Sequence, residues 1–155
     1  MAKKKKSDSK HVPSEACPER SRRVEESVGG STGKSQRRKK IIANGARAFA
    51  VAAAKIADER HCSDIVILDL QGLSPATDYF VIVTGTSDRQ MRTVADEIRE
   101  EAKKRGQPRF GLAGYEHGRW IVLDFIDVVV HIFDSEYRDY YDLELLWGDA
   151  KRIDY

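Results

Sequence analysis

The chain has 155 residues, of which 41% are apolar and 34% are charged, so its length allows a single domain. No apolar segment approaches the roughly 20 residues of a membrane-spanning helix, and no hydrophobic run precedes a cleavage-like site. The sequence therefore predicts neither a membrane protein nor a secretory leader. The net charge of +2 conceals an asymmetry, because residues 1–44 carry a balance of +8 and residues 45–155 a balance of −6.

Residues 1–42 predict a disordered basic extension. They contain KKKK and GGSTGKSQRRKK and almost no large apolar side chain, so they cannot bury enough surface to offset the entropy of ordering. We interpret them as a solubilising or simply tolerated extension, and a weak, salt-sensitive contact with RNA is the alternative. The two cysteines, Cys17 and Cys62, have no paired spacing, which is typical of reduced thiols in a cytoplasmic protein.

Residues 43–155 predict a folded α/β domain. An Ala-rich helix is expected first, then two strands rich in β-formers, and then a helix that begins near Thr86-Ser87-Asp88 and ends at Gly106. A short strand, two longer strands and a closing amphipathic helix that reaches Trp147 follow. The expected ranges are 43–60, 64–70, 78–84, 88–105, 109–113, 120–125, 128–133 and 134–147. This order indicates a single compact domain, in which one mixed sheet is flanked by helices.

The strand expected over residues 120–125 has two different faces. Ile121, Leu123 and Phe125 share a core face, while Trp120, Val122 and Asp124 share the opposite face. Nine acidic residues and only two basic ones lie between residues 116 and 149. An acidic surface with interleaved aromatic rings repels a phosphate backbone and attracts a basic protein. The alternative is a solvated acidic rim whose aromatic rings pack inward.

The turn Gly85-Thr86-Ser87-Asp88, between a strand and a helix, is the place where a nucleotide could bind. It lacks the Lys and the glycines of phosphate-binding motifs, and no Asp-x-Asp on a strand follows it to hold metal ions. The four histidines have no ligand spacing, and we interpret His131, within an apolar strand, as a packed residue. We therefore expect a protein that is not an enzyme and has no cofactor or metal. The alternative is a nucleotide-binding or nucleotidyl-transferring enzyme that uses Thr86, Ser87 and Asp88.

Five motifs together carry a family resemblance that covers residues 44–153. They are TDYFVI, GTSDRQ, GYEHGRW, DVVVH and YYDLELLWGDA, and their combination resembles the ribosomal silencing factor family, also called the Iojap-related proteins. The resemblance implies a fold similar to nucleotidyltransferases but without the catalytic carboxylates. It also implies that the chain binds ribosomal protein fourteen of the large ribosomal subunit, blocks joining of the subunits and represses translation when nutrients are scarce.

The resemblance further implies a contact surface for that basic ribosomal protein. Its expected partner-binding residues are Trp120, Val122, Asp124, Asp127, Tyr140, Tyr141, Leu143 and Trp147. Trp120 is the expected anchor, since a large aromatic beside a carboxylate is typical of protein interfaces. An exposed apolar sheet edge or face would also allow a homodimer. The long basic extension departs from the usual family pattern, so the resemblance implies nothing about it.

Overall fold

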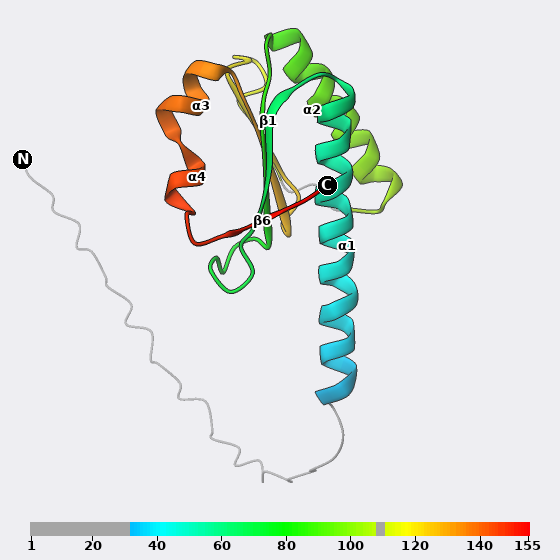
Figure 1. The fold of residues 1–155 in the computed structure, drawn as a ribbon. Helices are drawn as coiled ribbons and strands as arrows, with labels where there is room; N and C mark the ends of the chain where they lie inside the picture. The colour runs from blue at the N-terminus through cyan, green and yellow to red at the C-terminus, as the bar shows by residue number, and fades with distance from the viewer. Residues whose placement is uncertain (1–31, 108–110) are drawn as a thin grey trace, which may run out of the picture. The chain divides into compact units, whose positions relative to one another are not determined.

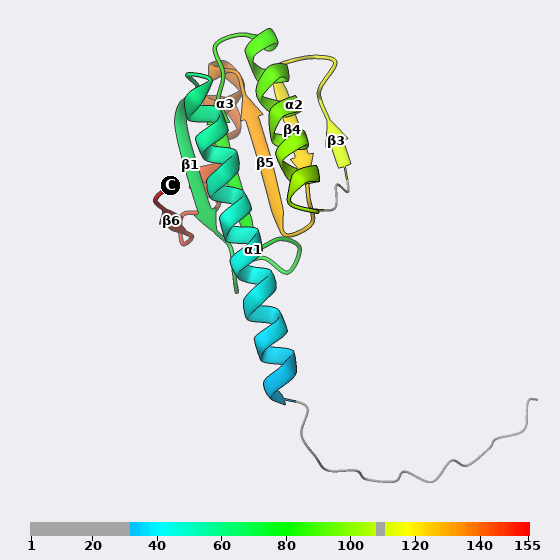
Figure 2. The ribbon, with the colours of Figure 1, turned by 90° about the vertical axis from the view of Figure 1, so that its right-hand side faces the viewer.

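A computed structural model of the chain describes residues 32–107 and 111–155, with side chains from residue 44 onward. The predicted extension over residues 1–31 lies outside these described residues. The described residues form three layers, with helices α1 and α2 on one face of a six-stranded sheet and the short helices α3 and α4 on the other (Figure 1). Seen from the side of the long helices, α1 and α2 lie in front of the strands (Figure 2).

The sheet is mixed and has the strand order β3-β4-β5-β2-β1-β6. Its strands are β1 (Ser63–Asp69), β2 (Tyr79–Thr84), β3 (Gly111–Ala113), β4 (Trp120–Asp124), β5 (Val128–Phe133) and β6 (Lys151–Ile153). The central strands β2 and β5 pair in parallel, and the other neighbouring strands pair antiparallel. This architecture confirms the predicted fold class. The long helices cover one face of β5 and α3 contacts part of the other, so five of its six residues are buried and nearly all are apolar.

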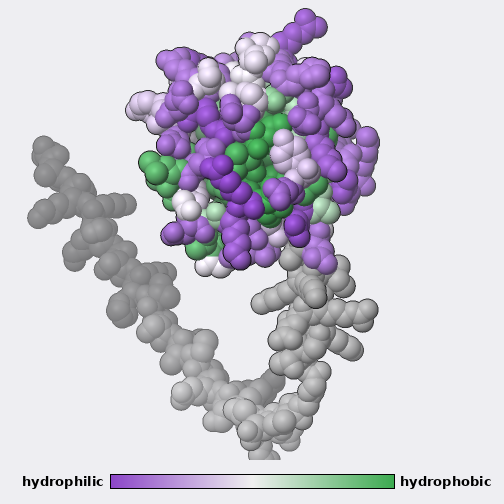
Figure 3. All heavy atoms as spheres, in the orientation of Figure 1, coloured by the Kyte–Doolittle hydropathy of each residue, from purple (hydrophilic) through white to green (hydrophobic). Residues whose placement is uncertain are grey.

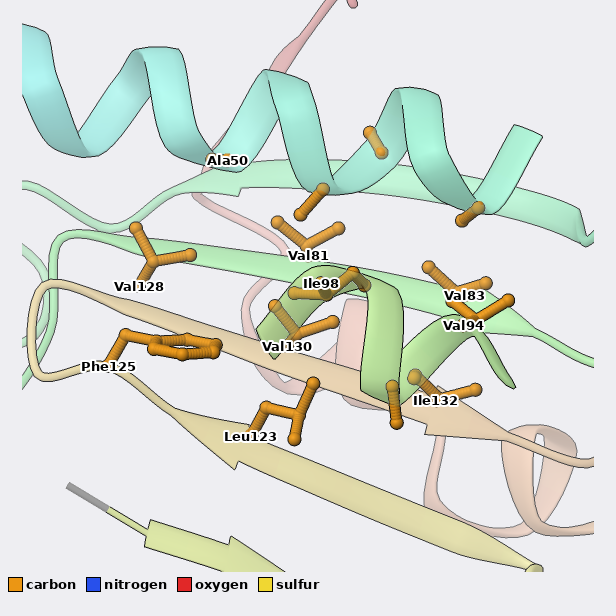
Figure 4. Packing of buried hydrophobic residues seen from close by; sticks show 14 of the residues in the cluster. Ala50, Val81, Val83, Val94, Ile98, Leu123, Phe125, Val128, Val130 and Ile132 are labelled. Carbon is orange, nitrogen blue, oxygen red and sulfur yellow. The ribbon is translucent and has the colours of Figure 1, made fainter. Parts of the chain in front are cut away.

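The main core lies between the sheet and the two long helices. α1 (Thr32–Glu59) faces the sheet with fully buried alanines, which let the helix approach closely, and its Phe49 packs edge-on against Phe125 with ring centroids 4.9 Å apart. α2 (Asp88–Lys104) begins at Ser87, whose side chain accepts a hydrogen bond from the Gln90 amide. Figure 4 shows Val94 and Ile98 of this helix among the valines of β2 and β5.

The outer layer consists of α3 (Ser135–Tyr141) and α4 (Leu143–Leu146). Asp134 caps α3 by accepting a hydrogen bond from the Tyr137 amide at 2.7 Å. Asp142 ends α3 in a left-handed conformation, with φ +38°, and caps α4 through the Leu145 amide. The predicted single closing helix is therefore wrong, because the left-handed residue interrupts the helical backbone.

Two further boundaries differ from the prediction. α1 begins at Thr32 rather than at residue 43, so the residues between them, assigned to the extension, are helical. Their Lys, Arg and Gln residues have good helix propensity, which the prediction of disorder from charge overlooked. Strand β6 was not predicted. Its three residues form a strand because they pair with β1 at Ile67 to Asp69.

Candidate functional site

The outer face of β4 is an open strip of the sheet. Ile121 and Leu123 are fully buried beneath the long helices, whereas Trp120, Val122 and Asp124 are half-buried on the opposite face. This alternation confirms the two faces predicted for the strand. On the neighbouring strand β5, Val129 pairs with Asp124 and His131 pairs with Val122, so Val129 and His131 continue the same face. The strip combines apolar side chains with one carboxylate.

Trp120 is packed within its own domain. Its ring stacks on Phe133 with centroids 4.9 Å apart, and Tyr141 of α3 covers it at 4.6 Å. The indole Nε1 donates a hydrogen bond to His131 Nδ1 at 3.3 Å. Trp120 lies on the face that the sequence predicted, but much of its ring holds α3 against the sheet.

His131 lies beneath this aromatic cluster and is only 7% exposed. The Phe80 ring packs edge-on against it at 4.7 Å, and burial lowers the pKa of the imidazole to about 4. Because Nδ1 accepts the hydrogen bond from Trp120 Nε1, the neutral ring carries its own proton on Nε2. Nε2 has no hydrogen-bond partner within the described residues. The interpretation of His131 as a packed residue agrees with this burial.

The opposite end of the strip is acidic. Asp124 Oδ1 accepts a hydrogen bond from the Ile126 amide at 2.8 Å, and this bond stabilises the turn between β4 and β5. The Asp127 carbonyl accepts hydrogen bonds from the amides of Asp78 and Tyr79, both at 3.0 Å. Burial, together with the nearby carboxylate of Asp78, raises the pKa of Asp127. The Asp127 backbone therefore joins this turn to the start of β2, while the Asp124 carboxylate holds the turn and lies on the open face.

The four site residues predicted on the closing helix separate into two pairs. Leu143 and Trp147 turn inward and pack against the outer core cluster, where Trp147 lies edge-on to Phe80 at 5.8 Å. Tyr140 and Tyr141 are both exposed, but to different degrees. Tyr140 turns outward and is 80% exposed, whereas Tyr141, 39% exposed, also covers the Trp120 ring. The helical spacing of these residues did not separate the pairs, because a second short helix begins between them.

The prediction from the sequence also missed two leucines. Leu145 and Leu146 of α4 are 78% and 72% exposed, which leaves large apolar side chains in solvent. Figure 3 shows apolar side chains over α4 at the left edge of the view. Adjacent leucines in a pattern such as LELLW are typical of core residues, so only the structure identifies them as surface residues.

Arg138 fixes α3 and α4 to the end of the sheet. Its guanidinium donates hydrogen bonds to Thr84 Oγ1 at 3.1 Å, to the Asp64 carbonyl at 2.9 Å and to Glu144 Oε1 at 2.5 Å. The side chain is 9% exposed and that of Glu144 is 19% exposed, so the ion pair is largely shielded from water. This one residue joins α3, α4, β1 and β2.

A hollow of about 300 Å³ follows the edge of β1 beside β6 and is lined by Ile65, Val66, Ile67 and Ile153 among others. Figure 3 shows apolar side chains gathered at the centre of the view, over this edge. The β1 backbone is irregular here, because its register shifts between Ser63 and Val66. In addition, the Asp64 carbonyl already accepts a hydrogen bond from the Arg138 guanidinium. These features oppose the addition of another strand at the β1 edge.

The turn considered for nucleotide binding is filled by its own chain. The Thr86 amide donates to Gln90 Oε1 at 2.7 Å, and the Gln90 amide donates to Ser87 Oγ at 3.2 Å. A Cβ at Gly118 would lie 2.4 Å from the Asp88 Cβ, which shows how closely the loop before β4 covers the start of α2. The groups that would bind a phosphate are therefore used in capping and packing.

The described residues, 32–107 and 111–155, contain neither a grouping of metal ligands nor a membrane-crossing helix. Within these ranges, no cluster of three or more His, Cys, Asp or Glu residues is arranged to hold a metal ion. No helix among them is both long enough and apolar enough to cross a membrane.

Comparison with known proteins decides the family. The model of the family described as "Ribosomal silencing factor during starvation" matches residues 32–155. The chain belongs to the ribosomal silencing factor family. This membership confirms the resemblance in the sequence motifs, and the match begins at the first residue of α1 rather than at residue 44.

Relatives in this family come from bacteria and from plants. The ribosomal silencing factor RsfS of Bacillus subtilis is 42% identical over 102 residues, which cover 66% of this chain and 86% of that protein. The chloroplastic protein Iojap of Zea mays is 35% identical over 106 residues, covering 68% of this chain and 46% of that protein. A crystal structure of a Chromobacterium violaceum protein superposes with a TM-score of 0.63 at 33% identity, covering 66% of this chain and 85% of that one.

Proposed function

We propose that this ribosomal silencing factor binds ribosomal protein fourteen of the large subunit through the open strip of β4 and the adjoining α3–α4 segment. Occupation of that protein keeps the small subunit from joining, and translation falls when nutrients are limited. The chain acts by steric exclusion rather than by catalysis. Family membership supports the role, and the open strip is the structural observation that carries the proposed site.

Charge supports a basic protein as the partner. Asp124 lies on the strip, and Asp139, Asp142 and Asp149 are on or beside the α3–α4 segment. Of the nine acidic residues between positions 116 and 149, three form ion pairs with Arg119 or Arg138, so most of the negative charge remains available. Negative charge at this density favours Lys and Arg on the partner and disfavours RNA phosphates.

Asp124→Asn provides a direct test. The amide oxygen of Asn still accepts the hydrogen bond from Ile126, so the turn is retained while the charge is removed. We expect weaker binding to purified ribosomal protein fourteen, with a difference that shrinks as salt is added. The matched control is Asp58→Asn, which should not change the affinity. Asp58 is an exposed residue of α1, on the face of the sheet that the long helices cover.

A ribosome assay tests the proposed role. Wild-type protein should sediment with free large subunits, be absent from joined ribosomes, and reduce subunit association measured by light scattering. Asp124→Asn should be weaker in each assay. Unimpaired subunit joining at saturating wild-type protein would contradict the proposal. Sedimentation of the chain alone records whether it forms a homodimer.

A further inference from the structure

Helix α3 has a small cleft on its exposed surface. The cleft holds about 330 Å³ and is lined by Glu136, Tyr137, Tyr140 and Tyr141. These positions follow the i, i+1, i+4, i+5 spacing that places residues on one side of a helix. None of the open-strip residues of β4 lines it, so it is a separate subsite on the same side of the domain.

Three tyrosine rings of α3 form the walls of the cleft. Tyr140 stands edge-on to Tyr141 at 5.0 Å, and Tyr137 lies 5.8 Å from Tyr141. Tyr141 is supported from behind by Trp120 at 4.6 Å. Aromatic faces carry partial negative charge, so rings that open to solvent attract a cation. The 80% exposure of Tyr140 leaves room for a ligand beside its ring.

The same helix already binds one guanidinium of its own chain. Arg119 lies 4.4 Å above the centre of the Tyr137 ring and donates hydrogen bonds to Asp134 and Glu136. Carboxylate and ring thus act together on a planar cation at this place. The Glu136 side chain is still 77% exposed, so its carboxylate remains accessible from the cleft.

The negative charge around the cleft disfavours an anionic ligand and a second copy of the chain. Residues 134–149 contain six acidic residues and a single basic one, Arg138, which is buried. An anionic ligand such as a phosphate is repelled by this charge. A second copy of the chain would bring the same acidic α3–α4 segment against this one, which also costs free energy. The cleft therefore suits a cationic side chain.

We propose that the cleft formed by Glu136, Tyr137, Tyr140 and Tyr141 binds an arginine side chain of the protein partner. The inference rests on the proposed function for the partner, and it adds the chemistry by which α3 recognises that partner. Arginine fits better than lysine, because a planar guanidinium stacks on a tyrosine ring while it donates to a carboxylate. Arg119 on Tyr137 shows this arrangement within the chain.

The first test uses a peptide and needs no ribosomal protein. The full-length chain is titrated with acetyl-Gly-Arg-Gly-amide, and the tyrosine ring signals are followed by NMR. The control peptide carries citrulline in place of arginine, which keeps the shape and removes the charge. We expect the signals of Tyr140 and Tyr141 to shift with the arginine peptide and much less with citrulline. Equal shifts with both peptides, or shifts only outside α3, would overturn the proposal.

The second test measures the affinity for ribosomal protein fourteen. Tyr140→Ala should weaken binding about fivefold, the effect of losing one cation–ring contact, while Tyr140→Phe should retain the affinity. Tyr155→Ala, which removes another exposed tyrosine, is the matched control. Unchanged affinity of Tyr140→Ala alongside tight wild-type binding would overturn the assignment of the arginine to this partner. Absence of wild-type binding would instead overturn the proposed function. The peptide titration would then still test whether the cleft binds arginine.

Discussion

Replacing Arg138 by Leu should remove the contact that joins the outer helices to the sheet. The change leaves the Glu144 carboxylate, the Asp64 carbonyl and the Thr84 hydroxyl without their donor. Breaking a buried ion pair by removing one partner costs about 3–5 kcal/mol. Because Glu144 is 19% exposed and regains some water, we expect a loss of about 3 kcal/mol, a large share of the roughly 5–15 kcal/mol typical of a domain.

Urea unfolding followed by circular dichroism measures this loss. Arg105→Leu is the matched control, because Arg105 forms a surface pair with Glu101 and its removal should change stability by less than about 1 kcal/mol. The double variant Arg138→Leu with Glu144→Leu should regain part of the loss, since no carboxylate then lacks a partner. If Arg138→Leu were no more costly than Arg105→Leu, the guanidinium would not be what holds the outer helices in place.

Three further predictions concern the outer face. Trp120→Ala should lower the unfolding free energy by about 2 kcal/mol, because the half-buried ring packs against Phe133 and Tyr141; an unchanged melting curve would show that this packing is dispensable. Leu145→Ser with Leu146→Ser should keep stability within about 1 kcal/mol and weaken binding to ribosomal protein fourteen about tenfold, whereas Leu73→Ser, also exposed, should do neither. The folded-state pKa of His131, about 4, is below its usual value, so the unfolded chain binds more protons between these values and wild-type stability falls as the pH drops from about 6.5 to 4. In His131→Phe the loss of unfolding free energy over this pH range should be smaller by up to roughly 3 kcal/mol. Parallel curves of stability against pH for the two proteins would contradict the lowered pKa of His131.

Local patterns were sufficient for the strands and for the faces of β4. Alternation over residues 120–124 placed Trp120, Val122 and Asp124 on one side, because side-chain direction in a strand depends only on position. The packing of the Trp120 ring inside its own domain could not be predicted in the same way. It depends on Tyr141, a contact across 21 positions of the chain that no local pattern encodes.

Other differences have similar physical reasons. Asp142 divides the last helical segment because its backbone is left-handed, and an Asp at that position is equally compatible with a continuous helix. Strand β6 exists only through its pairing with β1, since a Lys-Arg-Ile segment has little strand signal of its own. The exposed leucines of α4 were missed because hydrophobicity alone does not tell a core position from a binding surface.

The parallel pairing of β2 with β5 has a consequence for how the chain folds. These central strands are adjacent in space, but Tyr79 and its partner Val128 lie 49 positions apart, with α2 and two other strands between them. Closing so long a loop costs entropy before any contact compensates for it, so this step should follow formation of the β4–β5 hairpin. During synthesis the sheet therefore cannot close at its centre until β5, near the end of the chain, has left the ribosomal tunnel.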